Sequence, residues 1–266
     1  MDFLFDFYRT LRFATRLPLP QLQREEDDPI VSADGFAPAF ALTGLVPGLV
    51  GGLTITLALA LRAEPLLTAL LAVATMIMVT GALHEDGLAD CADGIGGGRT
   101  VERKLEIMRD SAIGTYGVLA LILSVGLRAA ALASIAMFSP LAGLTALLAT
   151  QTLSRAMAML AASNLAHARK DGAAAALGSP SHRAAQAALA VGTMIALVSL
   201  LAGLGLSAGI VAALACAIAM LGATIWASHI ARTHIGGQTG DILGAIQQLC
   251  DLAGLLVISI CVGIMF

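Results

Sequence analysis

Three aspartates, Asp86, Asp90 and Asp93, recur at helical spacing in a charged stretch of an otherwise apolar chain. Because an α-helix has about 3.6 residues per turn, this spacing places their carboxylates within about 60° of arc on one helical face. Carboxylates held so close together repel one another, and a hard divalent cation such as Mg²⁺ relieves that repulsion. We therefore predict that this trio is a catalytic Mg²⁺ site, which the neighbouring carboxylate of Glu85 can join.

A glycine run and several basic residues follow the aspartates. The backbone N–H groups of Gly96–Gly98 can approach an anion closely and form a phosphate-binding nest. Arg103, Lys104 and Arg109 supply positive charge at the same place. Carboxylates, glycines and basic residues together are typical of metal-assisted phosphoryl transfer. A solvated helix end with a flexible turn would give the same local pattern, but the scarcity of charge elsewhere favours the metal site.

Membrane-spanning helices must position these residues, because the chain is too apolar for an ordinary soluble domain. Of its 266 residues, 58% are hydrophobic and 12% are charged, whereas a soluble domain is about 25% charged. Apolar stretches without period-two alternation predict helices rather than a transmembrane barrel. We expect a single all-α domain, residues 1–266, with about seven spans of the roughly 20 residues that cross a bilayer. The spans are predicted at Ala37–Leu61, Pro65–Leu83, Gly117–Met137, Leu141–Ala162, Ala185–Ala202, Ser207–Ala227 and Ile242–Phe266.

The N-terminal segment, residues 1–34, is expected to begin as an amphipathic helix on the membrane surface. Phe3, Phe7 and Leu11 share one side of this helix, although a helix in the cytosol would show the same pattern. The four cysteines form no C-x-x-C pair and are expected to pack as small apolar side chains. The formal net charge of -3 gives no reason to expect nucleic acid as a partner.

Three long connections, residues 84–116, 163–184 and 228–241, hold much of the charge and are expected to form the active-site loops. Basic residues accumulate on the cytoplasmic side of membrane proteins. The N-terminal segment and these connections contain Arg9, Arg12, Arg16, Arg24, Arg99, Arg103, Lys104, Arg109, Arg169, Lys170, Arg183 and Arg232. We therefore expect a multi-pass protein of the bacterial inner membrane, with its N-terminus and active-site loops in the cytoplasm.

Further candidates lie in the second half of the chain. Arg155 is near the end of a span, Arg169 is in the glycine-containing loop Ala168–Gly178, and Asp241 follows a glycine pair. Asp251 lies about three turns further into the last span. An ionisable group at that depth is a functional candidate, and a polar contact between packed helices is the alternative.

The block His84–Gly117 resembles the signature of the cobalamin synthase (adenosylcobinamide-GDP ribazoletransferase) family. An acid is followed by D-G-L-A-D-x-x-D-G, then by R-K-L-E-I-M, D-S and I-G-T-Y-G. The similarity extends to FATRLPLP (Phe13–Pro20), to Ala168–Gly178 and to GGQTGD (Gly236–Asp241), so it covers nearly the whole chain. Departures from the family pattern put individual substrate contacts in doubt, and they occur at Arg109, Ala112, Thr233, His234 and Gln248.

The resemblance implies transfer of the adenosylcobinamide phosphate moiety from adenosylcobinamide-GDP to the 5′-hydroxyl of α-ribazole, or to α-ribazole 5′-phosphate, with release of GMP. It also implies Mg²⁺ as the cofactor, held by the three aspartates. The substrate-binding candidates that follow are Arg103, Lys104, Arg109, Asp110, Arg155, Arg169 and Asp241. Membrane lipid is an expected partner. A homo-oligomer and association with other enzymes that assemble the cobalamin nucleotide loop are left open.

Two other classes of protein share some of these features. A CDP-alcohol phosphatidyltransferase has an acidic motif that Asp90, Asp93 and Gly94 echo in part, but the rest of that motif is missing. A transporter can also combine intramembrane acids with glycine-broken helices. Against a transporter, the charge is concentrated on one side and the chain shows no internal repeat.

Overall fold

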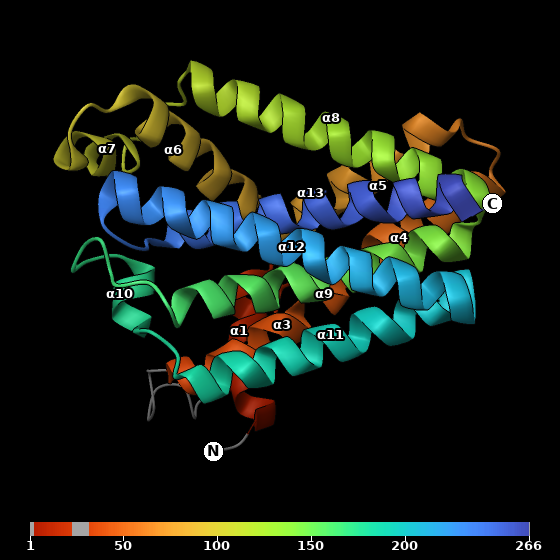
Figure 1. The fold of residues 1–266 in the computed structure, drawn as a ribbon, viewed down its shortest axis with the longest axis horizontal. Coiled ribbons are helices and arrows are strands. Elements are labelled where there is room, and N and C mark those ends of the chain that lie inside the picture. The colour runs from red at the N-terminus through yellow and green to blue at the C-terminus, as the bar shows by residue number, and fades with distance from the viewer. Residues whose placement is uncertain (1–2, 23–31, 266) are drawn as a thin grey trace.

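The computed structural model describes residues 3–22 and 32–265, and these form a bundle of helices that run side by side (Figure 1). The helices are α1 (Phe3–Ala14), α3 (Ala33–Thr43), α4 (Leu45–Ala60), α5 (Pro65–Thr80), α6 (Leu83–Gly97), α7 (Val101–Ile107), α8 (Thr115–Phe138), α9 (Pro140–Ala162), α10 (Ala173–Leu177), α11 (His182–Leu204), α12 (Leu206–Ile235) and α13 (Gly240–Met265). The predicted all-α fold is confirmed. Arg24, most of the polar tract Gln21–Asp28 and Phe266 lie outside the described residues.

Within the described ranges, five helical segments are long and apolar enough to cross a membrane: α3 with α4, α8, α11, α12 and α13. A sixth is counted only if α5 and α6 form one broken span. The predicted number of seven is therefore not confirmed. α5 has only 16 residues. α9 has 23 residues, but it buries polar side chains such as Thr150, Gln151 and Arg155 against other helices, which lowers its hydropathy.

The break between α5 and α6 turns the chain by 93°. Gly81 and Ala82 both adopt left-handed backbone conformations, with φ of 64° and 59°, which end the right-handed helix. Arg16 packs against Gly81, and its backbone N–H donates to the carbonyl of Val79 at 2.7 Å. The segment after α1 therefore covers the point at which the chain turns into α6.

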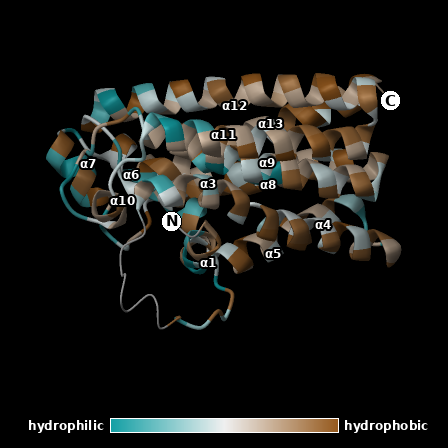
Figure 2. Ribbon diagram, turned by 90° about the horizontal axis from the view of Figure 1, so that it is seen from below, coloured by the Kyte–Doolittle hydropathy of each residue, from teal (hydrophilic) through white to brown (hydrophobic). Residues whose placement is uncertain are grey.

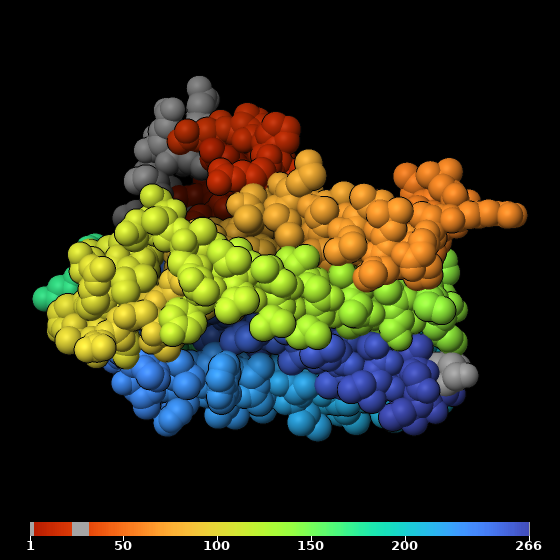
Figure 3. All heavy atoms as spheres, turned by 90° about the horizontal axis from the view of Figure 1, so that it is seen from above, coloured from red at the N-terminus to blue at the C-terminus, as the bar shows by residue number. Residues whose placement is uncertain are grey.

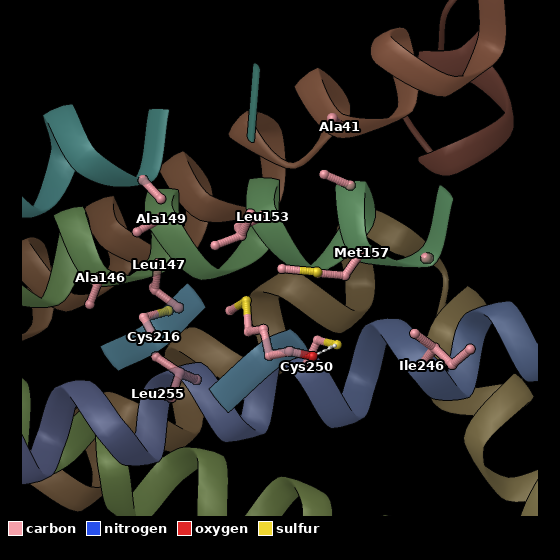
Figure 4. Packing of buried hydrophobic residues seen from close by; sticks show 14 of the residues in the cluster. Ala41, Ala146, Leu147, Ala149, Leu153, Met157, Cys216, Ile246, Cys250 and Leu255 are labelled. Atoms are coloured by element: carbon pink, nitrogen blue, oxygen red, sulfur yellow. Dashed lines mark hydrogen bonds between the residues drawn. The ribbon is translucent and has the colours of Figure 1, made fainter. Parts of the chain in front are cut away.

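α9 lies at the centre of the bundle and packs against α4, α11 and α13. Figure 4 shows Leu147 of α9 next to Cys216 of α12 and Leu255 of α13. These three side chains are fully buried. Cys91, Cys216 and Cys250 are buried free thiols, as the sequence predicts.

The two ends of the bundle differ in polarity. Polar residues are concentrated at the end of the bundle that carries α6, α7 and α10, whereas the lengths of the long helices are mostly apolar (Figure 2). Large apolar side chains on the outer faces of α8 and α12 are exposed, among them Ile122, Ile218 and Ile225. A surface of this kind is suited to lipid. The candidate site residues therefore gather at one end of a membrane-embedded bundle.

The predicted N-terminal helix is present as α1. Its buried residues are Phe5, Asp6, Arg9, Thr10 and Ala14, and the apolar residues predicted to lie on the membrane surface are exposed or partly buried. The inward face is polar because α1 packs on α3 and lines a cavity there. Figure 3 shows the N-terminal residues raised above the bundle near the end that carries α6 and α7.

Candidate active site

The predicted loop 84–116 is largely helical. α6 carries the three aspartates, as their spacing predicts, and α7 follows it. α6 stays helical because its small and apolar side chains pack between α8 and α13. Asp86 is exposed, Asp90 is partly buried and Asp93 is buried, so the three carboxylates have different surroundings although they share one face.

Asp93 interacts with the start of α8. Its Oδ2 accepts a hydrogen bond from the backbone N–H of Gly114 at 2.7 Å, and its Oδ1 accepts one from Gly117 at 2.9 Å. A carboxylate at a helix N-terminus satisfies free N–H groups and interacts favourably with the helix dipole. Asp93 therefore positions α8 relative to α6, and its predicted role as a Mg²⁺ ligand stays a prediction.

Asp241, at the first turn of α13, comes close to Asp86 and Asp90. The carboxylate of Asp90 is repelled by those of Asp86 and Asp241 and is attracted by Arg169. Arg169 Nη2 donates to Asp241 Oδ2 at 3.3 Å, and the hydroxyl of Thr239 donates to the same oxygen at 3.1 Å. The structure thus joins two predicted aspartates of α6 with two predicted substrate-binding residues from later in the chain.

The types of side chain in this cluster suit Mg²⁺. In the described part of the chain, no three His, Cys, Asp or Glu side chains converge closely enough to enclose a metal ion. Mg²⁺ commonly uses only one or two protein carboxylates and takes its other ligands from substrate phosphates and water. Asp86, Asp90 and Asp241 offer carboxylates that repel one another, and a cation would relieve that repulsion. The donor set therefore fits a substrate-completed magnesium site.

A close approach of α6 to α13 brings the carboxylates of the two helices together. A Cβ atom placed on Gly87 would lie 2.8 Å from the backbone oxygen of Asp241 and 3.1 Å from its Cα. On the other helix, Gly244 lies against the backbones of His84 and Gly87. Only glycine at position 87 allows this separation, so Gly87 sets the distance between Asp86 and Asp241.

Replacing Gly87 with alanine is expected to lower the turnover number by about 100-fold, because a shift of about 1 Å in a reacting group has that effect. The added methyl group would push Asp241 away from Asp86 without removing a polar side chain. Gly222→Ala on α12 is the matched control, because a Cβ there meets nothing within 4 Å. Steady-state kinetics of both variants check the prediction, and equal turnover numbers would contradict it.

The predicted phosphate-binding residues Lys104 and Arg109 contact neighbouring elements. Lys104 Nζ lies 3.0 Å from Nδ1 of His234 at the end of α12. Arg109 Nη2 donates to Asp171 Oδ1 at 2.5 Å and also attracts Asp241 electrostatically. Arg109 therefore lies near the carboxylate cluster, and Lys104 lies next to the C-terminal end of α6, which carries two of its aspartates.

Arg103 and Asp110 are exposed, and their contacts are local. Arg103 Nη1 pairs with Glu106 Oε2 at 2.6 Å on the same helix, and Asp110 Oδ1 accepts the backbone N–H of Ala112 at 3.0 Å. Exposed pairs of this kind contribute little to stability. Both side chains are thus able to exchange these partners for substrate groups.

The predicted phosphate-binding nest at Gly96–Gly98 is wrong. None of the three glycines has a positive φ, and a nest needs alternating right- and left-handed residues. They form the end of α6, where Gly98 donates to the carbonyl of Gly94 at 3.0 Å. Gly96 packs against the ring of Tyr116, and Gly98 packs against Lys104. The absence of side chains serves close packing here.

A cavity of about 470 Å³ opens beside the carboxylate cluster. Its walls come from α1, α3, α6, α9, α10 and α13. Asp86, Arg169 and Asp241 line it, together with the apolar residues Phe13, Phe36, Phe40, Leu83, Met159, Leu177 and Leu243. A concave, mainly apolar site with a few polar groups is typical of small-molecule binding.

The sequence interpretation missed the part of this cavity that comes from α1 and α3. Arg9, Thr10, Phe36 and Phe40 line it, but neither helix carries a metal-binding or phosphate-binding pattern. The one available signal was the family-like stretch Phe13–Pro20, which begins at the end of α1 and precedes α3. The N-terminal helix is therefore part of the site rather than only a membrane anchor.

Arg155 lies behind the cavity rather than in it, which corrects its predicted position. Its side chain is 1% exposed, and Nη1 donates to both the carbonyl and the Oε1 of Gln151 at 2.8 Å. Its guanidinium lies 5.9 Å from the ring centroid of Phe40, which separates it from the cavity. A buried guanidinium that stacks on an aromatic ring supports the wall of the site.

Glu85 belongs to a buried ionic cluster and not to the group of carboxylates near Asp86. Its Oε1 lies 3.1 Å from Arg128 Nη1 and accepts a hydrogen bond from Gln248 Nε2 at 3.1 Å. Arg128 Nε lies 3.5 Å from Asp251 Oδ2, and the Oε1 of Gln248 accepts from Arg128. The prediction that Glu85 joins the metal site is corrected, because burial pairs this carboxylate with an arginine.

The fold and the site together define a class of protein: a helical membrane protein with a carboxylate cluster at the polar end of its bundle. The family model described as cobalamin-5-phosphate synthase matches residues 6–259. The chain belongs to this family, which confirms the resemblance seen in its motifs. No solved structure matches the chain.

Curated relatives cover nearly the whole chain. A protein from Rhizobium johnstonii is 43% identical over 259 residues, which is 97% of each chain. One from Sinorhizobium medicae is 45% identical over 255 residues, 95% of each chain. One from Bradyrhizobium diazoefficiens is 46% identical over 245 residues, 92% of this chain and 89% of the relative. All three are named adenosylcobinamide-GDP ribazoletransferase.

Proposed function

We propose that this protein is an adenosylcobinamide-GDP ribazoletransferase whose active site is the carboxylate cluster of Asp86, Asp90 and Asp241. The similarity of nearly the whole chain to relatives of that name carries the proposal. The attacking group is a ribose ring hydroxyl and not the predicted 5′-hydroxyl, because the 5′-oxygen of α-ribazole 5′-phosphate already carries a phosphate. Its oxygen attacks the cobinamide-side phosphorus of adenosylcobinamide-GDP and loses its proton. The bond between that phosphorus and the bridging oxygen breaks, and GMP leaves. The products are adenosylcobalamin and GMP, or adenosylcobalamin 5′-phosphate and GMP when the acceptor is α-ribazole 5′-phosphate.

Different residues of this chain would bind the metal ion, orient its ligands and contact the phosphate groups. Asp86, Asp90 and Asp241 would hold Mg²⁺, which when bound supplies positive charge to the diphosphate. Arg169 orients Asp241, with which it pairs. Arg109, near the cluster, and Lys104, next to the end of α6, would contact phosphate oxygens.

The site is proposed to face the cytoplasm from the bacterial inner membrane. Arg169, Lys104 and Arg109 lie at the same polar end of the bundle as α1, which contributes Arg9 and Arg12. Arg62 is at the opposite end of α4. Basic residues concentrate on the cytoplasmic side. The exposed apolar faces of α8 and α12 would contact lipid.

Mass spectrometry of the products tests the proposed function. Purified protein in nanodiscs is given adenosylcobinamide-GDP and α-ribazole with Mg²⁺, and a parallel sample contains EDTA. We expect adenosylcobalamin and GMP in equal amounts with Mg²⁺ and neither product with EDTA. Well-folded protein that forms no product would contradict the proposal. Turnover of a CDP-activated lipid would then indicate a phosphatidyltransferase, and uptake of unchanged substrate into vesicles would indicate a transporter.

A further inference from the structure

Three phenylalanine rings form one wall of the cavity beside the carboxylate cluster. The ring centroids of Phe13 and Phe36 are 5.7 Å apart with an interplanar angle of 71°, and those of Phe36 and Phe40 are 5.2 Å apart at 18°. Phe13 is 52% exposed, whereas Phe36 and Phe40 are buried. Such a wall offers both faces and edges of aromatic rings to a flat apolar ligand.

The carboxylates of the cavity are on the side of α6 and α13, and the other polar lining residues include Arg9 and Thr10 on α1. Asp86, Arg169 and Asp241 line the cavity on the former side, while the short helix α10 contributes Ala174, Ala176 and other small or apolar residues. A ligand with an apolar ring at one end and a polar reacting group at the other would match this division. The cavity volume of about 470 Å³ is within the range of roughly 300–1,000 Å³ found for small-molecule sites.

We propose that this cavity binds the aromatic base of α-ribazole and directs the reacting ribose hydroxyl toward Asp86 and Asp241. The inference rests on the proposed function and assigns α-ribazole, one of the two substrates, to this cavity. The two substrates contain four ring systems large enough to fill a site of this kind. Guanine and the adenine of the adenosyl group have polar edges that need several hydrogen-bond partners, and the corrin ring with its amide side chains is much larger than the base. The dimethylbenzimidazole of α-ribazole is flat, bicyclic and apolar, as the phenylalanine wall requires.

The assignment gives α1 a role in substrate selection. Phe13 is near the end of α1, lines the cavity and is half exposed, and Arg9 and Thr10 of the same helix also line it. The corrinoid substrate would then approach the carboxylate cluster from outside this cavity. Substitutions in the phenylalanine wall should weaken the binding of α-ribazole far more than the binding of adenosylcobinamide-GDP.

Binding and kinetics of two cavity variants test the assignment. Phe13→Ala removes a half-exposed ring, and Ala176→Trp fills the cavity from α10. We expect each variant to weaken binding of α-ribazole alone by about tenfold in calorimetry, corresponding to about 1.4 kcal/mol. The KM for α-ribazole should rise by a similar factor, and the KM for adenosylcobinamide-GDP should change less than about threefold. Ile122→Ala, on the outer face of α8 and 62% exposed, is the control and should change neither constant.

The outcomes separate this assignment from the proposed function. If the wild-type protein forms adenosylcobalamin but the variants raise the KM for adenosylcobinamide-GDP instead, the cavity binds the corrinoid substrate and only the assignment fails. Unchanged α-ribazole binding in Ala176→Trp, with loss of a co-purified lipid, would show that the cavity holds an acyl chain. Wild-type protein that binds α-ribazole in a Phe13-dependent way but forms no product would overturn the function and leave the binding site standing.

Discussion

Replacing Asp90 with asparagine is expected to lower the turnover number by about 1,000-fold or more without lowering the melting temperature. A group that helps to hold a catalytic cation contributes several kcal/mol to the transition state, and about 4 kcal/mol corresponds to that factor. Among the described residues Asp90 forms no ion pair or hydrogen bond, and it is repelled by Asp86, Asp93 and Asp241. Removal of its charge therefore relieves repulsion and breaks no contact. Steady-state kinetics and thermal unfolding in nanodiscs measure the two effects.

Asp93→Asn is the matched comparison, because the same change is made one helical turn away. Asp93 accepts two backbone hydrogen bonds from the start of α8, and hydrogen bonds to a charged group are worth about 1.5–3 kcal/mol. We expect this variant to lose thermal stability and to keep more activity than Asp90→Asn. A stable but inactive Asp93→Asn protein would show instead that Asp93 is a metal ligand, as its spacing predicts. Near-normal turnover in Asp90→Asn would exclude Asp90 from the metal site.

Replacing Arg128 with leucine is expected to lower the free energy of unfolding by about 3–5 kcal/mol. Arg128 is 1% exposed and forms ion pairs with both Glu85 and Asp251, and Arg155 also attracts the two carboxylates. Removal of Arg128 leaves two buried carboxylates without the cation that pairs with them, which costs far more than the lost contact alone. For a chain of this length the melting temperature should fall by about 10 °C. Circular dichroism during heating in nanodiscs gives the value.

A second substitution tests whether charge is the cause. Adding Asp251→Asn to Arg128→Leu removes one of the stranded carboxylates, so the double variant should recover part of the lost stability. Arg183→Leu, at the exposed start of α11, removes an arginine without stranding a buried acid and should leave the melting temperature unchanged. If the double variant were no more stable than Arg128→Leu, packing and not charge would explain the loss.

The membrane class, the helical fold and the position of the charged segment could all be predicted from the sequence. These properties follow from composition and local spacing, because a bilayer accepts only structures that satisfy their own backbone groups. The spacing of Asp86, Asp90 and Asp93 was also enough to place them on one face of a helix. The bend after α5 was harder to predict, since Gly81 is a recognisable signal but Ala82 in a left-handed conformation is not.

The number of spans could not be determined from hydropathy for a related physical reason. A hydropathy pattern does not distinguish a helix that faces lipid from one that is surrounded by other helices. α9 carries Thr150, Gln151 and Arg155 on faces that the bundle buries, and α5 is too short to cross alone. Which helix occupies the centre is a property of the packed bundle.

The sequence by itself determined which residue types the site contains, and the tertiary structure decided which of them act together. Gly87 lets α13 approach α6, so Asp241 joins Asp86 and Asp90 from more than a hundred residues away. The buried Glu85 pairs with Arg128, and Asp93 accepts hydrogen bonds from the start of α8. Helical spacing specifies only which side chains share a face. The partner that each charge finds depends on how the helices cross, because a buried charge is stable only beside the group that compensates it.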